Sequence, residues 1–217
     1  MEPGTGQAED TSADQPVLTP DEAMQKAMTD IASQSHEVSP FIFELFTEEK
    51  FFASLPAETQ RSPELLGGLL LHSSRFDTLL HQKPETIFGE VVQVAETTHA
   101  DGRIRHEEEG PRIKVDDLRE AGIDPSKVLF FRLTQPSDQP KPEYYWTTDY
   151  GETMKGLRME VSEERRRTAI ILVADLATIN QNEGLIRDRN DDNGLAVRQI
   201  GLDTFNQSKA IARVPTS

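Results

Sequence analysis

An arginine inside an apolar stretch is the first residue of this chain whose position suggests chemistry. Arg132 lies in "LFFRLT", where a guanidinium between apolar neighbours requires an anionic partner, either internal or bound. Further along, "YYWTTDY" holds the chain's only tryptophan and all three of its tyrosines. A guanidinium and hydroxyls can hold a phosphate, and an aromatic face can stack on a nucleoside. The candidate ligand-binding residues are Arg132, Tyr145, Trp146, Thr148 and Asp149.

The same residues also fit a purely structural interpretation. Arg132 could form an internal salt bridge to an acid such as Asp149 or Asp175, with the aromatic side chains packed in the core. The sequence leaves both interpretations open, because they differ in whether Arg132 lines a pocket or meets an internal carboxylate.

The arginine-bearing stretch and the aromatic, threonine-rich stretch follow each other in an order that resembles that of the NAD-dependent ADP-ribosyltransferases. In that family an early strand supplies an arginine, a later strand carries a Ser/Thr-rich or aromatic motif, and a third element supplies a catalytic glutamate. The resemblance covers about residues 128–200 and implies NAD as cofactor, with Arg132 and Thr147 at the first two positions. Where the paired-acid strand is expected the chain reads "GLAVRQIG", and only Glu183 lies near. The resemblance therefore implies an NAD-binding enzyme or an inactive relative.

The apolar pattern predicts helices first and a sheet afterwards. Residues 1–18 are rich in Gly, Pro, Ser, Thr and acids and are expected to be disordered. Residues 19–83 are predicted to form a helical N-terminal subdomain, and residues 84–217 an α+β domain. "VLFFRL" and "AIILVA" are predicted as its middle strands, with the tryptophan-bearing segment beside them. The predicted fold is thus α+β: an N-terminal helical segment followed by a mixed or antiparallel sheet of about six strands with short helices.

Three hydroxyl–proline pairs mark the starts of the predicted helices, at positions 19–20, 39–40 and 62–63. A hydroxyl residue before a proline at the first helical position is typical of an N-cap, and Glu22 completes a capping box with Thr19. These signals predict helices over about 20–34, 40–53 and 63–81. Proline-directed phosphorylation is the alternative use of the three pairs. Gly67 and Gly68 cost the third helix roughly 1 kcal/mol each relative to alanine, which indicates a close approach by another backbone.

The second predicted helix, "PFIFELFTEEKFFA", holds half of the ten phenylalanines. Its aromatic residues run nearly all round the helix, which exceeds what one core-facing stripe uses. Phe41, Phe43 and Phe46 are therefore the candidate partner-binding residues, and full burial against the third helix is the alternative.

The amino-acid composition of the chain excludes several classes of function. The net charge is −15, and the first 22 residues contain six acids and no Lys or Arg. Such a chain repels nucleic acid and anionic lipid, so a protein partner is expected, with a basic protein as one option. No signal peptide is visible and the longest apolar run is too short to cross a bilayer, so a cytoplasmic location is predicted. With no cysteine, thiolate sites and cysteine nucleophiles are excluded.

Metal and enzyme motifs are also missing from the sequence. The loop "DRNDDNG" does not have glycine and glutamate at the positions that an EF-hand loop requires. A looser cation site in this loop is an alternative. His99 and His106 could form a zinc-binding pair across a predicted hairpin, but a plain surface hairpin is the preferred interpretation. No P-loop, nucleophile elbow or dinucleotide fingerprint is present. The preferred function is a non-enzymatic protein-interaction domain, with an NAD-binding enzyme and an acidic mimic of nucleic acid as alternatives.

Overall fold

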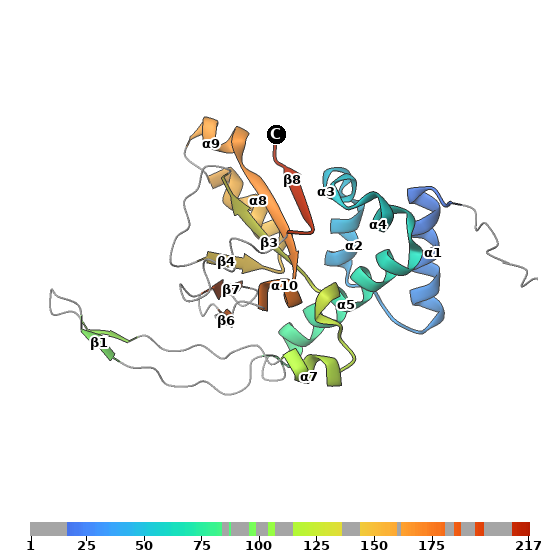
Figure 1. Cartoon of the computed structure of the whole chain (residues 1–217), viewed down its shortest axis with the longest axis horizontal. Coiled ribbons are helices and arrows are strands. Elements are labelled where there is room, and N and C mark those ends of the chain that lie inside the picture. Colours follow the sequence, from blue (N-terminus) through green and yellow to red (C-terminus); the bar gives the residue numbers. More distant parts are fainter. Residues whose placement is uncertain are drawn as a thin grey trace, which may run out of the picture.

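A computed structural model gives the structure of this chain. It describes residues 17–83, 87, 96–98, 104–106, 115–135, 144–159, 162–180, 185–187, 194–197 and 210–217. Helices and an antiparallel sheet are both present, so the predicted α+β class is confirmed. Helices α1 to α5 gather at the right of Figure 1 and the sheet lies at the left. Within the described residues, no helix combines the length and the apolar character needed to span a bilayer.

The helices before the sheet begin largely where the hydroxyl–proline pairs predict. Thr19 accepts the Glu22 amide at 3.3 Å and the Glu22 carboxylate accepts the Thr19 amide at 2.8 Å, which confirms the capping box. Ser62 accepts the Leu65 amide at 3.2 Å. Ser39 makes no such cap; its hydroxyl donates to another helix instead. The helices are α1 (Pro20–Ser33), α2 (Pro40–Thr47), α3 (Glu49–Ser54), α4 (Ala57–Arg61) and α5 (Pro63–Gln82).

The prediction of one helix over about 40–53 is wrong, because the chain turns at Glu48. This residue is extended, with φ −73° and ψ 115°, and it separates α2 from α3. Its carboxylate accepts the Phe51 amide at 2.6 Å and so acts as the N-cap of α3. A glutamate in the middle of an apolar run is thus a helix start rather than a helix interior residue.

The large sheet is antiparallel throughout, in the order β6-β7-β4-β3-β5-β8. β3 pairs with β5 from Leu129 opposite Asp175 to Thr134 opposite Ile170, and with β4 through Phe131 opposite Thr147. The predicted adjacency of "VLFFRL", "AIILVA" and the tryptophan segment is therefore confirmed. The strands are β3 (Leu129–Thr134), β4 (Tyr144–Thr147), β5 (Ile170–Asp175), β6 (Leu185–Arg187), β7 (Gly194–Val197) and β8 (Ala212–Pro215).

Shorter elements connect and flank these strands. A second, two-stranded ladder pairs β1 with β2 in the region of the predicted hairpin, whose tip lies outside the described residues. The Asp175 carboxylate at the end of β5 accepts the Thr178 amide at 2.7 Å and so starts the helix that follows. The elements are β1 (Glu96–Thr98), β2 (Ile104–His106), α7 (Val115–Glu120), the 3-10 turn η1 (Pro125–Lys127), α8 (Tyr150–Met159), α9 (Glu163–Thr168) and α10 (Leu176–Asn180).

Two apolar clusters lie on opposite faces of the sheet. Phe130 of β3 packs in one cluster, with Trp146, Leu176 and the C-terminal half of α5. Phe131, its neighbour in sequence, packs in the other cluster with α1, α2, α3 and the N-terminal half of α5. The alternation follows from the period of two residues along a strand. The helices and the sheet share a core, whereas the division into domains at residue 83 stays a prediction.

Helix α5 also connects segments through polar side chains. The buried Ser73 hydroxyl donates to the Lys127 carbonyl and accepts the Leu129 amide, both at 3.2 Å. The neighbouring Ser74 hydroxyl accepts the Ser39 amide at 3.0 Å, at the start of α2. These bonds fix the positions of β3 and α2 relative to α5, and they satisfy backbone groups that water does not reach.

Gly67→Ala is expected to raise the free energy of unfolding by about 0.5 to 1 kcal/mol, the difference in helix propensity. A Cβ at Gly67 would lie 3.7 Å from the Ala27 Cβ, an ordinary contact. Gly122 is the matched control: its φ is +75° after α7, so Gly122→Ala is expected to cost about 1 kcal/mol. Urea denaturation measures both variants. A destabilised Gly67→Ala would show that packing against α1 requires the glycine.

Candidate functional site

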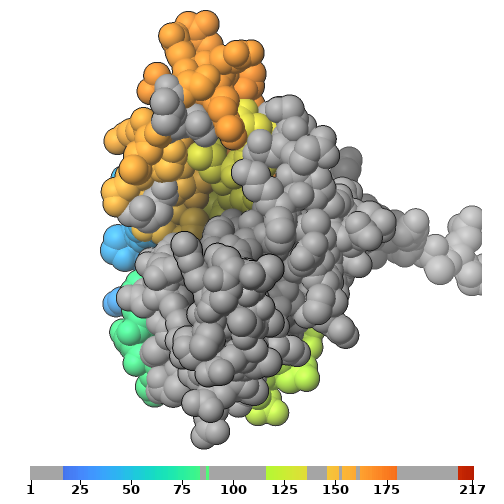
Figure 2. Space-filling model, turned by 90° about the vertical axis from the view of Figure 1, so that its left-hand side faces the viewer, coloured from blue at the N-terminus to red at the C-terminus, as the bar shows by residue number. Residues whose placement is uncertain are grey.

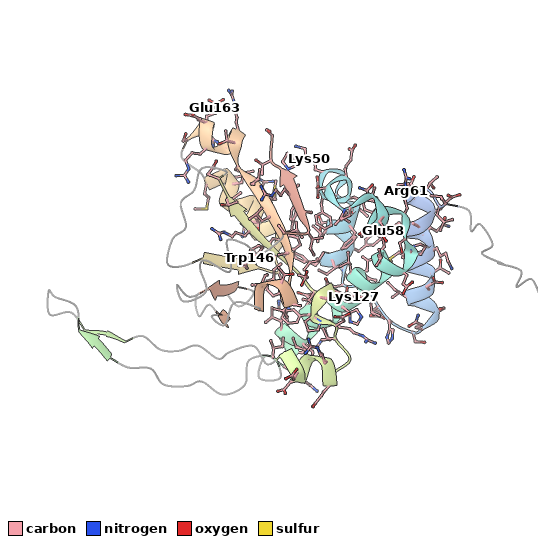
Figure 3. The ribbon with its side chains drawn as sticks, viewed as in Figure 1. Lys50, Glu58, Arg61, Lys127, Trp146 and Glu163 are labelled. Atoms are coloured by element: carbon pink, nitrogen blue, oxygen red, sulfur yellow. The ribbon has the colours of Figure 1, made fainter. Side chains whose placement is uncertain are left out.

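Arg132 and Trp146 lie on neighbouring strands. The pairing of Phe131 with Thr147 in an antiparallel ladder sets Arg132 opposite Trp146, on the face shared with Phe130. Arg132 is half-buried, whereas Trp146 is 3% exposed and belongs to the core cluster. Figure 3 labels Trp146 on the sheet. The ring therefore fills the core and offers no open face on which a ligand could stack.

The residues after Trp146 form the turn into α8. Thr148 is 4% exposed, and the Thr147 hydroxyl accepts the Asp149 amide at 3.0 Å. The Asp149 carbonyl accepts the Thr153 amide at 3.2 Å and so starts α8. Thr147 thus serves the local fold, and the Thr148 side chain is buried. The Tyr145 side chain and the whole of Glu183, the third position of the transferase resemblance, lie outside what the structure describes.

No match was found among family models, curated proteins or solved structures. Family membership therefore adds nothing to the transferase resemblance. NAD binding stays a prediction, and its test is an NAD-dependent rise in melting temperature that disappears in Arg132→Ala.

The three phenylalanines predicted to bind a partner have different environments. Phe46 is 2% exposed, and its ring meets the Phe51 ring edge-on with centroids 5.3 Å apart. Phe41 is half-buried against the same cluster. Phe43 is 42% exposed and points away from the core. Of the three, Phe43 is the one whose side chain is free to contact another molecule.

The surroundings of Phe43 are acidic. Glu37, Glu44 and Glu49 are exposed and Glu48 is half-buried, all within six positions of Phe43 in the sequence. Lys50, labelled in Figure 3, is the single lysine or arginine between residues 34 and 57. An exposed aromatic ring in an acidic stretch of the sequence fits a partner that presents an apolar side chain beside lysine or arginine.

A cluster of polar groups that the sequence did not reveal lies on the second half of α5. Asp77 accepts the Ser39 hydroxyl at 3.2 Å, and its carboxylate lies 3.5 Å from Nδ1 of His81. Burial raises the pKa of Asp77, with a smaller contribution from the charge of Asp149. The spacing of Asp77 and His81 by one helical turn is the one signal that could have been noticed. His81 does not contact Ser39, so the cluster lacks the order of a nucleophile–base–acid relay.

Asp77→Asn is expected to raise the melting temperature at pH 7. The raised pKa means that the folded state holds the proton more tightly than the unfolded state. The stabilisation from Asp77 is complete below its unfolded value of 3.8 and is lost as the pH rises through the folded pKa. The gain of the variant should therefore shrink as the pH falls toward 4. A lower melting temperature at pH 7 would show that the contact with His81 outweighs the burial of the charge.

A second polar cluster holds the turn before β3 against α5. His72 Nδ1 accepts the Asp124 amide at 3.1 Å, and burial lowers the pKa of His72, helped by the Lys127 charge. Arg75 donates to the Gly122 carbonyl at 3.2 Å and lies 2.8 Å from His36 Nε2. Each contact ends on a backbone group or on a neighbouring ring, so the cluster is structural.

No metal site emerges from the described residues, where no group of three or more His, Asp or Glu side chains could hold an ion. The loop "DRNDDNG" is described only at its final glycine, and His99 lies outside the described residues.

Proposed function

We propose that this chain is a non-enzymatic protein-interaction protein, and that the outer face of α2 binds a basic segment of a partner protein. The observation that supports it best is Phe43, an aromatic side chain 42% exposed next to carboxylates. Aromatic residues are frequent among the few that dominate binding energy at protein interfaces. The net charge of −15 favours association with a basic partner. The cytoplasmic location belongs to the same proposal.

The alternative of an acidic mimic of nucleic acid is a special case of this proposal, in which the basic partner itself binds nucleic acid. The two differ in the identity of the partner. Competition by DNA or RNA distinguishes them. Nucleic acid should displace this chain from the captured partner if the chain is a mimic, because both then occupy the same site on that partner.

The test is photo-crosslinking from position 43 in the full chain, with Met159, 79% exposed on α8, as the control position. One identified protein should crosslink from position 43 and not from position 159. Phe43→Ala should weaken binding of that protein at least about tenfold and change the free energy of unfolding by less than about 1 kcal/mol. Equal crosslinking from both positions would contradict the proposal.

The acidic surroundings are tested separately by Glu44→Lys with Glu49→Lys. Charge reversal of two exposed carboxylates should slow association and weaken binding of the partner identified at position 43. Unchanged affinity at low salt would show that the partner is not basic at this surface.

A further inference from the structure

A histidine on α5 holds the turn that leads into β3. His72 Nδ1 accepts the Asp124 amide at 3.1 Å, and both residues are half-buried. A backbone amide can only donate, so this bond requires that Nδ1 carries no proton and that His72 is neutral. Protonation would place two donors, Nδ1–H and the Asp124 N–H, against each other. The contact between the turn and α5 therefore depends on the protonation state of one ring.

A second contact between α5 and the same turn involves another imidazole. Arg75 donates to the Gly122 carbonyl at 3.2 Å, and its other terminal nitrogen lies 2.8 Å from His36 Nε2. A guanidinium has donors only, so His36 Nε2 must accept this bond without a proton. Two imidazoles thus support residues 122–124, one directly and one through Arg75.

The charges around His72 disfavour a proton on its ring. Burial lowers the pKa of His72 below its ordinary value of 6.5, and the charges of Lys127 and Arg75 lower it further, whereas the charge of Asp124 opposes them. Within the described residues these three side chains are the charges that act on His72. Two of them are positive and one is negative, so a protonated ring would lie in a positive environment.

The helices that flank this region carry charges that are paired on their own helix. Lys26 pairs with Asp30 on α1 at 3.3 Å, and Arg119 pairs with Asp116 on α7 at 2.9 Å. All four side chains are more than half exposed, so their effect on a half-buried ring is screened by water. The turn and α5 therefore supply the charges that decide the protonation state of His72.

The far end of the turn is held by bonds that do not titrate. The Ser73 hydroxyl donates to the Lys127 carbonyl and accepts the Leu129 amide, and these bonds keep the start of β3 on α5 at any pH. Figure 3 labels Lys127 at this point, and Figure 2 shows the lime atoms of residues 115–127 at the lower edge of the molecule. The segment between Gly122 and Lys127 can therefore open without loss of the sheet.

We propose that His72 is a pH-dependent contact whose protonation releases residues 122–126 from α5 and exposes the side chain of Ile123. Ile123 is 2% exposed and packs in the cluster that contains Phe76 of α5, so its release brings apolar surface to water. The contact is complete above pH 6.5 and is lost as the pH falls through the lower pKa of the folded state. This device is separate from the face of α2 and does not depend on the proposed function.

The test is hydrogen exchange of the Asp124 amide in the full chain at pH 7.5 and pH 5.5. The rates are expressed as protection factors, which removes the intrinsic pH dependence of exchange. In the open turn His72 regains its ordinary pKa, so its protonation at pH 5.5 favours opening by up to about tenfold. The protection factor of Asp124 is therefore expected to fall about three- to tenfold, and amides in the middle of β5 should change less.

His72→Asn is the decisive variant, because the asparagine oxygen can replace Nδ1 as acceptor of the Asp124 amide and does not titrate. It should keep the protection at pH 7.5 within about twofold and lose the pH dependence. His81→Asn is the matched control. His81 is 53% exposed on α5 and contacts Asp77 rather than the turn, so this variant should keep the wild-type pH dependence.

A titration of the wild type by NMR gives a second measurement that needs no variant. The His72 ring and the Asp124 amide should shift together, with one midpoint below pH 6.5. An Asp124 amide that does not follow the His72 ring overturns the proposal, even if His72→Asn does not fold. Equal Asp124 protection at the two pH values in the wild type, or an equal fall in His72→Asn, also overturns it.

Discussion

Phe51→Ala is expected to lower the free energy of unfolding by about 3 to 5 kcal/mol, a large share of the stability of a domain this size. Phe51 of α3 is fully buried, and its ring lies 6.1 Å from the ring of Phe131 on β3 and 6.1 Å from that of Tyr150 on α8. One side chain therefore contacts the helical layer, the sheet and the helix that follows β4. Its removal leaves a cavity that rigid neighbours on three elements cannot fill.

A polar contact beside Phe51 also contributes to the stability of the fold. The Glu48 carboxylate that caps α3 also lies beside the Tyr150 hydroxyl, and burial, with the charge of Glu48, raises the pKa of Tyr150 to about 12. The hydroxyl therefore stays protonated at neutral pH and donates to the cap. Loss of Phe51 is expected to disturb this contact as well as the apolar packing.

Urea denaturation followed by circular dichroism and by tryptophan fluorescence measures the effect. Because Trp146 reports on the sheet and the helices dominate the dichroism, a shared core predicts coincident transitions in both signals. Phe43→Ala is the matched control and should cost less than about 1 kcal/mol. A sheet that keeps its wild-type transition in Phe51→Ala would instead favour the independent domains predicted at residues 19–83 and 84–217.

Ser73→Ala is expected to cost about 2 kcal/mol, although it removes a single oxygen atom. The hydroxyl is 3% exposed and serves both the Lys127 carbonyl and the Leu129 amide. Alanine fits the site without a clash but leaves both backbone groups buried without this partner, and each then loses its water without compensation. The predicted loss is therefore several times that of an exposed serine.

Ser33→Ala is the control, because its hydroxyl donates to the Asp30 carbonyl at an exposed helix end. It should change stability by less than about 0.5 kcal/mol. Hydrogen exchange adds a local measurement: the Leu129 amide should exchange faster in Ser73→Ala, while amides in the middle of β5 follow the global change alone. Equal stability of Ser73→Ala and the wild type would show that another acceptor replaces the hydroxyl.

Local signals in the sequence predicted local structure well. The capping box at Thr19 and the apolar runs of β3 and β5 depend on residues close in sequence, and each appears where it was predicted. The break at Glu48 was missed because a glutamate in the third turn of an apparent helix looks like a solvent-facing residue. Its role as a cap depends on a backbone turn that no propensity specifies.

The candidate site was harder to predict, for a physical reason. An aromatic residue on a strand has the same local sequence whether its ring lines a cleft or fills a core, and only the packing of distant elements decides. For Trp146 that packing comes from α10 and α5. The contacts of Asp77 with Ser39 and of Ser73 with Leu129 were likewise invisible, because these partners are more than thirty positions away.

The hydrogen bond that Ser73 accepts from the Leu129 amide has a consequence for synthesis on the ribosome. The two residues are 56 positions apart. At a translation rate of about 5 to 20 residues per second, β3 is therefore synthesised several seconds after the Ser73 segment of α5. During this interval the apolar sides of α3 and α5 have no sheet to cover them. The nascent chain should therefore engage chaperones at this stage, and slower translation after residue 83 should lengthen the exposure and lower the yield of folded protein.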